Sequence, residues 1–228
     1  MTLQLIDKSK IYFYLSLLLI LLSVHNANSI HFFDNFFKIK KINLIGEIDE
    51  NLNKNLLFSL EKFYNNSIFN INIEDIRVIL DNHNIINDYK IKKNYPSEVK
   101  IEIRETKILA YSFENNKKYF IGANGKKIKI EQFKNDKLPL IVGQFEVNKF
   151  LELNNVLLAN GFQLKDFEKF YFFKSNRWDL IYKNGTTIKL SNEDINASIN
   201  LFKQIIENPN NDKFSIIDLR LKNKIILL

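Results

Sequence analysis

The side chains that could perform acid–base or metal chemistry in this chain are three histidines and 26 carboxylates. His83 lies at the expected end of a helix, with no second histidine or paired carboxylate beside it. Most Asp and Glu residues fall on expected helix and strand exteriors, where solvation accounts for them. The chain has no cysteine, no Gly-rich phosphate loop, no GxSxG and no HExxH. We therefore expect no catalytic residue, no metal site and no cofactor, and we predict that the protein is not an enzyme.

The chain is basic, with a formal charge of +7, and its lysines could bind a polyanion. The stretch from Lys117 to Lys137 would be the footprint of a nucleic acid, an anionic membrane surface or a glycan. Most lysines, however, alternate with apolar residues along expected strands, which is typical of solvated strand faces. The 228 residues, 46% of them hydrophobic, suffice for one large or two small domains with a proper core.

An apolar run, Ile11 to Val24, follows Lys8 and Lys10 near the N-terminus. As a helix its 14 residues would span about 21 Å, less than the roughly 30 Å of a bilayer core. One interpretation is a membrane anchor over residues 11–33, ending with two phenylalanines at the interface. The other is a signal peptide cleaved near Ala27–Ser29.

Both interpretations place residues 1–10 in the cytoplasm as a short tail, because flanking lysines stay on that side of the membrane. Both also export everything after about Ser29. An exported chain does not meet DNA or RNA, so we expect no nucleic-acid partner.

The α+β pattern begins with one module over residues 37–106. FKIKKINLIG (37–46) predicts a strand with a bulge at its double lysine. Two helices follow, one capped by Asp49 and one that begins at Asn72 with a capping box. YKIKKNYPSEVKIEIRE (89–105) alternates strictly, which predicts two antiparallel strands joined at its Tyr-Pro. The expected order is strand–helix–helix–strand–strand.

Residues 107–228 are expected to form a mixed β-sheet domain with two helices. Asn124-Gly125 and Asn184-Gly185 each predict a hairpin. One helix is expected from about residue 146 to residue 160, and the other after the second hairpin. The chain closes on FSIIDLRLKNKIILL (214–228), an apolar strand pair whose last strand is expected at a sheet edge.

The first module resembles a POTRA domain, a βααββ fold. The resemblance rests on its strand positions and its Tyr-Pro turn: Ile39, Ile42, Leu44, Gly46, Tyr95-Pro96, Val99, Ile101, Ile103 and Glu105.

With an apolar segment before this module and a β-rich domain after it, residues 11–228 are similar to the FtsQ/DivIB family of bacterial cell-division proteins. The run Ile217-Asp218-Leu219-Arg220 near the C-terminus narrows the resemblance to this family. Two further pieces stand in order: Leu138-Pro139-Leu140 before Gly143, and Trp178-Asp179-Leu180 before Gly185. The tail of residues 1–10 is shorter than is usual in the family.

The resemblance implies a single-pass, bitopic scaffold of the division septum in the bacterial inner membrane, with a cytoplasmic N-terminus and a periplasmic bulk. The implied partners are FtsB-like and FtsL-like division proteins and other septal membrane proteins, bound by strand addition at the C-terminal edge strand. The resemblance places four residues at this contact: Arg220, Leu221, Asn223 and Lys224. Core burial would equally account for Leu221, and Arg220 could instead pair with Asp218 or Glu207.

The alternative to a septal scaffold is a POTRA-containing accessory protein of outer-membrane assembly or secretion.

Overall fold

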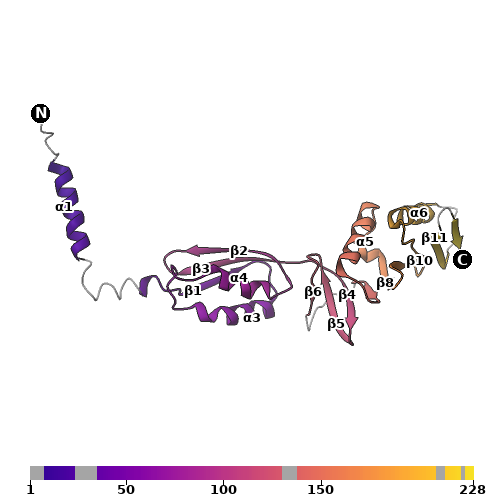
Figure 1. Cartoon of the computed structure of the whole chain (residues 1–228), viewed down its shortest axis with the longest axis horizontal. Coiled ribbons are helices and arrows are strands. Elements are labelled where there is room, and N and C mark those ends of the chain that lie inside the picture. The colour runs from indigo at the N-terminus through magenta and orange to yellow at the C-terminus, as the bar shows by residue number, and fades with distance from the viewer. Residues whose placement is uncertain (1–7, 24–34, 130–137, 209–213, 222–223) are drawn as a thin grey trace, which may run out of the picture. The chain divides into compact units, whose positions relative to one another are not determined.

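The computed structural model describes residues 8–23, 35–129, 138–208, 214–221 and 224–228. Contacts divide the chain into two compact units, Met1–Arg104 and Glu105–Leu228. Each unit has its own hydrophobic core, and Figure 1 shows the elements of both.

The N-terminal apolar run forms helix α1 (Lys8–Ser23). After Lys10 this helix consists of apolar and aromatic residues with two serines. Of the helices in the described part of the chain, none is both long and apolar enough to span a bilayer. The remainder of the expected anchor, and the expected cleavage site at Ala27–Ser29, lie outside the described residues.

Unit 1 has the expected order strand–helix–helix–strand–strand. Its elements are β1 (Lys41–Ile45), α3 (Glu50–Leu60), the 3-10 turn η1 (Glu61–Phe63), α4 (Ile73–Asp81), β2 (Ile86–Asn94) and β3 (Glu98–Glu105). The strands lie in the order β1-β3-β2, and β1 is parallel to β3. Both helices cover one face of this sheet (Figure 1), where their leucines and isoleucines pack against Ile42, Val99 and Ile101.

Both helices of unit 1 begin at the expected caps. Asp49 accepts hydrogen bonds from the backbone N–H groups of Asn51 and Leu52, at 2.9 and 3.3 Å. Asn72 accepts one from the backbone two residues on, at 3.1 Å. The Asn72 amide also donates to the Asp75 side chain at 3.4 Å, a contact between side chains in place of the reciprocal backbone hydrogen bonds of the predicted capping box.

The ends of β1 explain two features of its sequence. The N–H groups of Lys40 and Lys41 both donate to the carbonyl of Ser97, at 2.8 and 3.3 Å, which is the pairing expected of a bulge. Gly46 ends the strand with φ +143°, and a Cβ there would lie 2.1 Å from the carbonyl oxygen of Ile103. Only glycine fits this position, because the backbone conformation and the close approach both exclude a side chain.

Unit 2 is a nine-stranded mixed sheet with helices α5 (Val147–Ala159) and α6 (Ile195–Glu207). In spatial order the strands are β12 (Lys224–Leu227), β11 (Ile216–Leu221), β10 (Thr187–Lys189), β9 (Arg177–Tyr182), β8 (Phe167–Phe173), β7 (Leu140–Val142), β4 (Ile108–Glu114), β5 (Lys117–Gly122) and β6 (Lys127–Ile128). A 3-10 turn, η2 (Leu164–Asp166), precedes β8.

Both predicted hairpins are confirmed, because β5 pairs antiparallel with β6 and β9 with β10. The helix expected over residues 146–160 is α5, with Glu146 and Asn160 as its caps. Strands β7 and β8 were not predicted. They enter the sheet through parallel pairs, β4 with β7 and β7 with β8, and β10 pairs parallel with β11.

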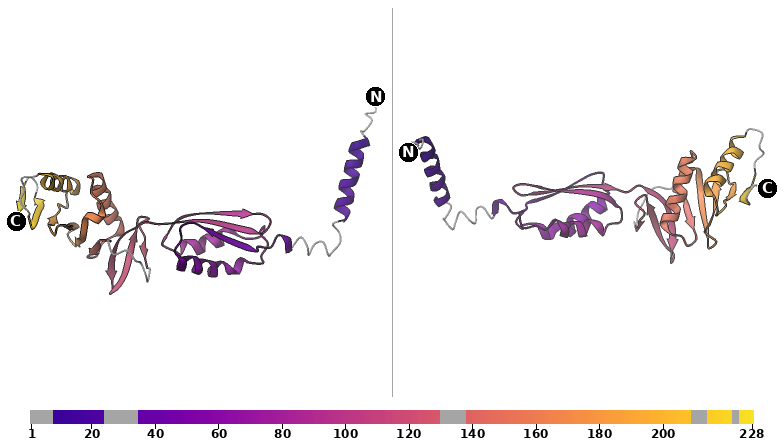
Figure 2. Two further views of the ribbon diagram at one scale, coloured as in Figure 1. Left: turned by 180° about the vertical axis from the view of Figure 1, so that it is seen from behind. Right: turned by 45° about the horizontal axis from the view of Figure 1, so that its top comes forward.

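One row of buried residues runs across five neighbouring strands of this sheet. Its members face one another in register: Ile141, Phe170, Leu180, Ile188 and Ile217. All five belong to the core, together with Phe150 of α5 and Phe202 of α6. Both helices therefore cover the same face of the sheet, as the views in Figure 2 also show. The opposite face carries the residues of alternate parity, and we call it the open face.

Candidate partner-binding edge

The C-terminal strand β12 is the last strand at one end of the nine-stranded sheet. It pairs antiparallel with β11, and no strand among the described residues pairs with its other side. Three apolar side chains at or just beyond this strand are exposed, Ile225, Leu227 and Leu228. A sheet edge of this kind offers unpaired backbone groups next to apolar side chains.

The register of β12 shows which backbone groups point outward. Leu228 exchanges two hydrogen bonds with Ile216, its N–H donating at 3.0 Å and its carbonyl accepting at 3.0 Å. Leu228 therefore directs its backbone groups toward β11. Because the two sides alternate along an antiparallel strand, Ile226 also points inward, opposite Asp218. The N–H and carbonyl groups of Ile225 and Leu227 point to the outer edge.

The four residues that the resemblance placed at the contact lie at or beside this edge, as far as they are described. Leu221 ends β11, faces Lys224 of β12, and is 55% exposed, so core burial does not account for it. Arg220 precedes Leu221 and is exposed. Asn223 lies outside the described residues.

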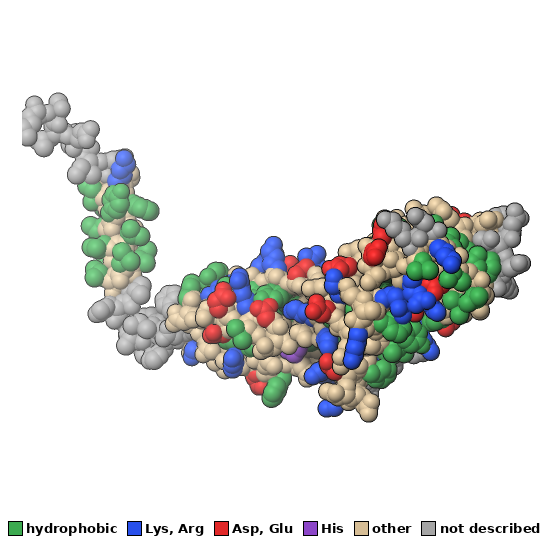
Figure 3. All heavy atoms as spheres, turned by 45° about the vertical axis from the view of Figure 1, so that its right-hand side comes forward, with side chains coloured by type: hydrophobic (Ala, Val, Ile, Leu, Met, Phe, Trp, Pro, Cys, Tyr) green, Lys and Arg blue, Asp and Glu red, His purple; other side chains and the backbone are tan. Residues whose placement is uncertain are grey.

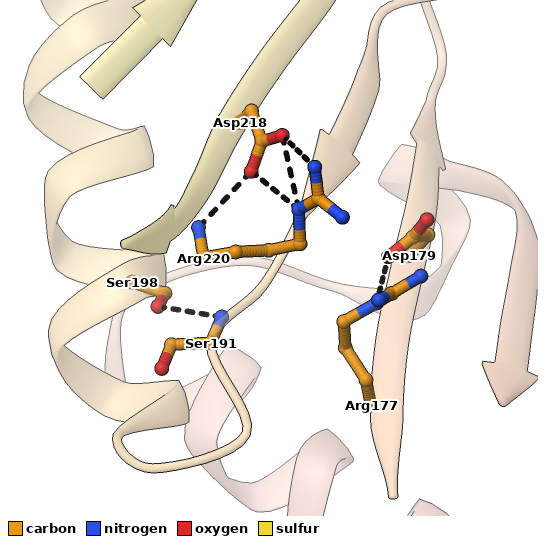
Figure 4. A network of polar contacts seen from close by, with 6 residues as sticks. All are labelled: Arg177, Asp179, Ser191, Ser198, Asp218 and Arg220. Carbon is orange, nitrogen blue, oxygen red and sulfur yellow. Dashed lines mark hydrogen bonds and ion pairs between the residues drawn. The ribbon is translucent and has the colours of Figure 1, made fainter. Parts of the chain in front are cut away.

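Arg220 makes an internal ion pair with Asp218, one of the two partners considered from the sequence. Its Nε donates to both carboxylate oxygens, at 2.8 and 3.0 Å, and its Nη2 donates to Oδ2. The backbone N–H of Arg220 donates to the same carboxylate at 3.1 Å. Figure 4 shows the guanidinium folded back over Asp218. These hydrogen bonds lower the pKa of Asp218 and raise the pKa of Arg220.

A row of charges runs across the open face beside this pair. Asp179 of β9, Lys189 of β10 and Asp218 of β11 are neighbours in register. The Nε of Arg177 donates to Asp179 at 3.1 Å (Figure 4). Burial raises the pKa of Asp179, and the positive charge of Arg177 opposes that rise. The two carboxylates therefore differ in kind: hydrogen bonds from Arg220 hold Asp218 in its charged form, whereas burial disfavours the charge on Asp179.

Arg177, Asp179 and Lys189 were not predicted as part of this site. The signal was present in RWDLIY, where Trp178 and Leu180 point to the core and Arg177 and Asp179 to the other face. That β11 lies beside β10 could not be read from the sequence, because α6 separates these two strands along the chain.

The start of α6 is tied to the strand before it by a buried serine. The Oγ of Ser198 accepts a hydrogen bond from the N–H of Ser191 at 3.2 Å (Figure 4) and donates to the carbonyl of Asp194 at 3.0 Å. Ser191 follows β10 by two residues, so this contact fixes the helix against the strand that supports β11.

The basic stretch from Lys117 to Lys137 makes contacts within unit 2. The Nζ of Lys127 lies 3.2 Å from a carboxylate oxygen of Glu114, and the Nζ of Lys118 lies 4.4 Å from the ring centre of Tyr111. Residues 130–137 lie outside the described residues. The described lysines named here therefore have partners of their own, which weakens the expectation of a polyanion footprint.

The described residues hold no group of three or more His, Cys, Asp or Glu side chains that could bind a metal ion. His83 lies just beyond α4, where its N–H donates to the carbonyl of Leu80 at 3.0 Å. Burial lowers the pKa of His83.

Comparison with known proteins bears on unit 2. Residues 110–220 match the family model described as "Cell division protein FtsQ/DivIB, C-terminal". One similar solved structure is the major extracytoplasmic domain of the trans isomer of the cell division protein DivIB from Geobacillus stearothermophilus. It is 15% identical, with a TM-score of 0.33, and the match covers 48% of this chain and 99% of that one. No curated protein sequence matches the chain.

The matched residues run from β4 to the Arg220 of β11, and so include the Asp218–Arg220 pair and the row of charges beside it. They end directly before Leu221, at the edge described above. The matched part of the chain, residues 110–220, therefore belongs to the FtsQ/DivIB family of cell division proteins.

Proposed function

We propose that this chain is a bitopic scaffold of the bacterial division septum, which binds its partners by accepting a strand at the outer edge of β12. Family membership supports a role in cell division. The observation that carries the finer proposal is the edge itself: Ile225 and Leu227 turn their backbone N–H and carbonyl groups away from β11. A partner segment in extended conformation would continue the ladder there.

The side chains near the edge would supply specificity. Leu221 and Ile225 offer exposed apolar surface, and Lys224 and Arg220 offer positive charge. Since Asp218 already holds the Arg220 guanidinium at three hydrogen bonds, Arg220 would present a fixed charge to the partner. Asn223 would join these residues by its position in the sequence. The partners of this proposal are FtsB-like and FtsL-like proteins of the same division machinery, and other septal membrane proteins.

The test is a pair of variants at Ile225, measured by co-purification of the chain with its FtsB-like and FtsL-like partners. Ile225→Pro removes an outward N–H and leaves the inward hydrogen bonds of β12 in place, a position where an edge strand tolerates proline. Ile225→Ala trims the side chain but keeps the N–H. We expect the proline variant to lose the partners and the alanine variant to keep most of them. Equal retention by both variants would refute strand addition at this edge.

The membrane part of the proposal has its own test. Residues 11–33 would be retained as the anchor in the inner membrane, with residues 1–10 in the cytoplasm and both units in the periplasm. A C-terminally tagged chain should remain full-length in carbonate-washed membranes and gather at mid-cell. A soluble band about 30 residues shorter would instead support the signal-peptide interpretation.

A further inference from the structure

Four aromatic rings of unit 1 contact one another in a continuous chain, which we call the aromatic patch: Phe36, Phe37, Phe69 and Tyr95. Phe37 is partly buried against the core and joins the three exposed rings. Ring centres lie 5.2 Å apart between Phe36 and Phe37, 4.9 Å between Phe37 and Phe69, and 5.2 Å between Phe69 and Tyr95. Phe36, Phe69 and Tyr95 are each about half exposed. Single exposed apolar residues are ordinary, but a contiguous cluster indicates an interaction surface.

The aromatic patch lies at the end of unit 1 where the chain enters the module. β1 and β3 are parallel and begin in register at Lys41 and Glu98, so residues just before each start share one end of the sheet. Tyr95 stands in the turn before β3, and Phe36 and Phe37 stand shortly before β1. Figure 3 shows hydrophobic side chains gathered at one end of unit 1.

The loop that carries Phe69 is held in place by the neighbouring strand. The Nζ of Lys93 donates to the carbonyls of Phe69 and Ile71, at 3.5 and 3.1 Å. The backbone N–H of Ile68 donates to the carbonyl of Phe37 at 2.9 Å. These contacts hold the backbone of the loop in the free chain, so little ordering of the loop is needed on binding.

The charge around the aromatic patch is positive. Residues 35–41 and 93–98 carry four lysines against one carboxylate, Glu98, which pairs with Lys41 at 3.6 Å. Lys93 is held by the loop carbonyls described above, so Lys38 and Lys40 are left to supply the net positive charge. The loop 66–72 carries no charged residue. Aromatic rings bordered by lysines are the composition favoured at the headgroup level of a bilayer, particularly one with anionic lipids.

The distance along the chain brings this surface close to the membrane. Only residues 24–34 separate the end of α1 from the start of the module. Eleven residues span at most about 40 Å even when fully extended. If α1 lies in the bilayer, as the proposed function requires, the start of the module stays within about 40 Å of the end of α1, a distance that allows contact with the lipid surface.

We propose that the aromatic patch docks unit 1 on the surface of the membrane that holds α1, with its rings at the headgroup boundary and Lys38 and Lys40 against anionic lipids. This docking rests on the membrane anchoring in the proposed function. It would fix one end of the first unit at the bilayer.

The experiment uses the full chain reconstituted in vesicles of phosphatidylcholine with a minority of phosphatidylglycerol, in which some lipids carry brominated acyl chains that quench tryptophan on contact. Phe69→Trp reports from the patch. Phe113→Trp on β4 is the matched control, since the two side chains are 55% and 54% exposed. The single native tryptophan, Trp178, is 2% exposed and serves as the internal unquenched reference. Tyr95→Trp is a second probe should Phe69→Trp disturb the loop.

Docking predicts that tryptophan at position 69 or 95 loses most of its emission to brominated lipid, while tryptophan at position 113 keeps it. High salt should weaken the patch quenching in part, because only the lysine contribution is screened. A chain that floats with the vesicles but shows equal emission at positions 69 and 113 would overturn the docking, leave the anchoring intact, and point to a protein occupant. A chain that does not float would overturn the anchoring and the docking together.

Discussion

One edge strand of unit 1, β2, and one edge strand of unit 2, β12, differ in character. In unit 1, the edge strand β2 carries Lys90, Lys92 and Lys93 among its nine residues. In unit 2, the edge strand β12 carries one lysine and three apolar residues. Lysines along an edge discourage the addition of another strand, whereas a flat apolar edge invites it.

Two ion pairs with the neighbouring strand β3 hold charged side chains of β2 in place. The Nζ of Lys92 lies 3.2 Å from Oε1 of Glu102. The Nε of Arg104 lies 2.8 Å from Oδ1 of Asp88. At the far end of the larger sheet, β6 has only two residues, which is another way to blunt an edge. Lysines therefore protect β2 and shortness protects β6, whereas the other two described edge strands, β12 and β1, each carry one lysine and three apolar residues. The contrast with β2 and β6, together with the exposed side chains of Ile225 and Leu227, supports a binding role for β12.

The largest effect on stability should come from a cavity in the core of unit 2, with a matching cavity in the core of unit 1 as the control. Ile217→Ala opens a cavity under β11, where Ile217 is 2% exposed, and should lower the free energy of unfolding of unit 2 by about 3 kcal/mol. Ile101→Ala makes a similar cavity in unit 1. Because Trp178 is the single tryptophan and lies in the core of unit 2, its fluorescence during urea unfolding reports that unit. Ile217→Ala should move this transition and Ile101→Ala should not; a shift with Ile101→Ala would mean that the two cores are coupled.

The next largest effect concerns the Asp218–Arg220 ion pair of β11, the strand that pairs with β12. Asp218→Asn removes the charge that accepts the hydrogen bonds of Arg220, and should lower the stability of unit 2 by about 2 kcal/mol. The sign of the pH dependence follows from the lowered pKa of Asp218. Its contribution is complete above the ordinary aspartate pKa of about 4 and is lost as the pH falls through the lowered value.

The measurement for this pair is the Trp178 urea midpoint in neutral and acid buffer. The wild-type chain should lose stability on acidification, and Asp218→Asn should lose less because the titrating group is gone. An acid loss of the same size in Asp218→Asn would assign that loss to other carboxylates.

A lysine placed on β12, like those on β2, should lower partner affinity more than it lowers the stability of unit 2. Ile225→Lys places a charge on the outer edge of β12 and should reduce partner affinity roughly tenfold, or about 1.4 kcal/mol. The Trp178 midpoint should hardly move, because Ile225 is exposed. Lys92→Ile removes one of the lysines of β2. It serves as the converse control and should leave partner affinity unchanged. Undiminished binding by Ile225→Lys would count against the edge as the contact.

The smallest effect is expected at the second carboxylate of the open face. The pKa of Asp179 is raised by burial, so its charge costs stability at neutral pH, and the cost is relieved as the pH falls through the raised value. Asp179→Asn removes this cost but also removes the partner of Arg177. The net change in unit 2 should stay within about 1 kcal/mol, with a pH dependence opposite in sign to that of Asp218→Asn. A large loss in Asp179→Asn would show that the Arg177 pair outweighs the burial cost.

Much of unit 1 follows from its sequence because its signals are local. Strict alternation over residues 89–105 and the caps Asp49 and Asn72 each specify an element without reference to the rest of the chain. Unit 2 follows less completely. β7 has three residues and β8 is an aromatic run without clean alternation, so neither has a sufficient periodic signal. Their parallel pairings depend on contacts between distant segments.

The candidate partner-binding edge could likewise be predicted from the sequence only in part. The spacing of Asp218 and Arg220 places them on the same face of one strand, and their pairing was one of two alternatives considered. The neighbouring Asp179 and Lys189 became part of the same surface only through strand order. The identity of the edge strand also required the sheet, since an apolar C-terminal strand could equally have been central.

Hydrogen–deuterium exchange at single-residue resolution across β12, with and without the FtsB-like partner, tests the central claim most directly. In the free chain, the amides of Ile226 and Leu228 should be protected by β11, while those of Ile225 and Leu227 exchange freely. Partner addition should protect Ile225 and Leu227 and leave the other two as they were. Binding that protects amides elsewhere, with Ile225 and Leu227 still exchanging freely, would contradict strand addition at β12.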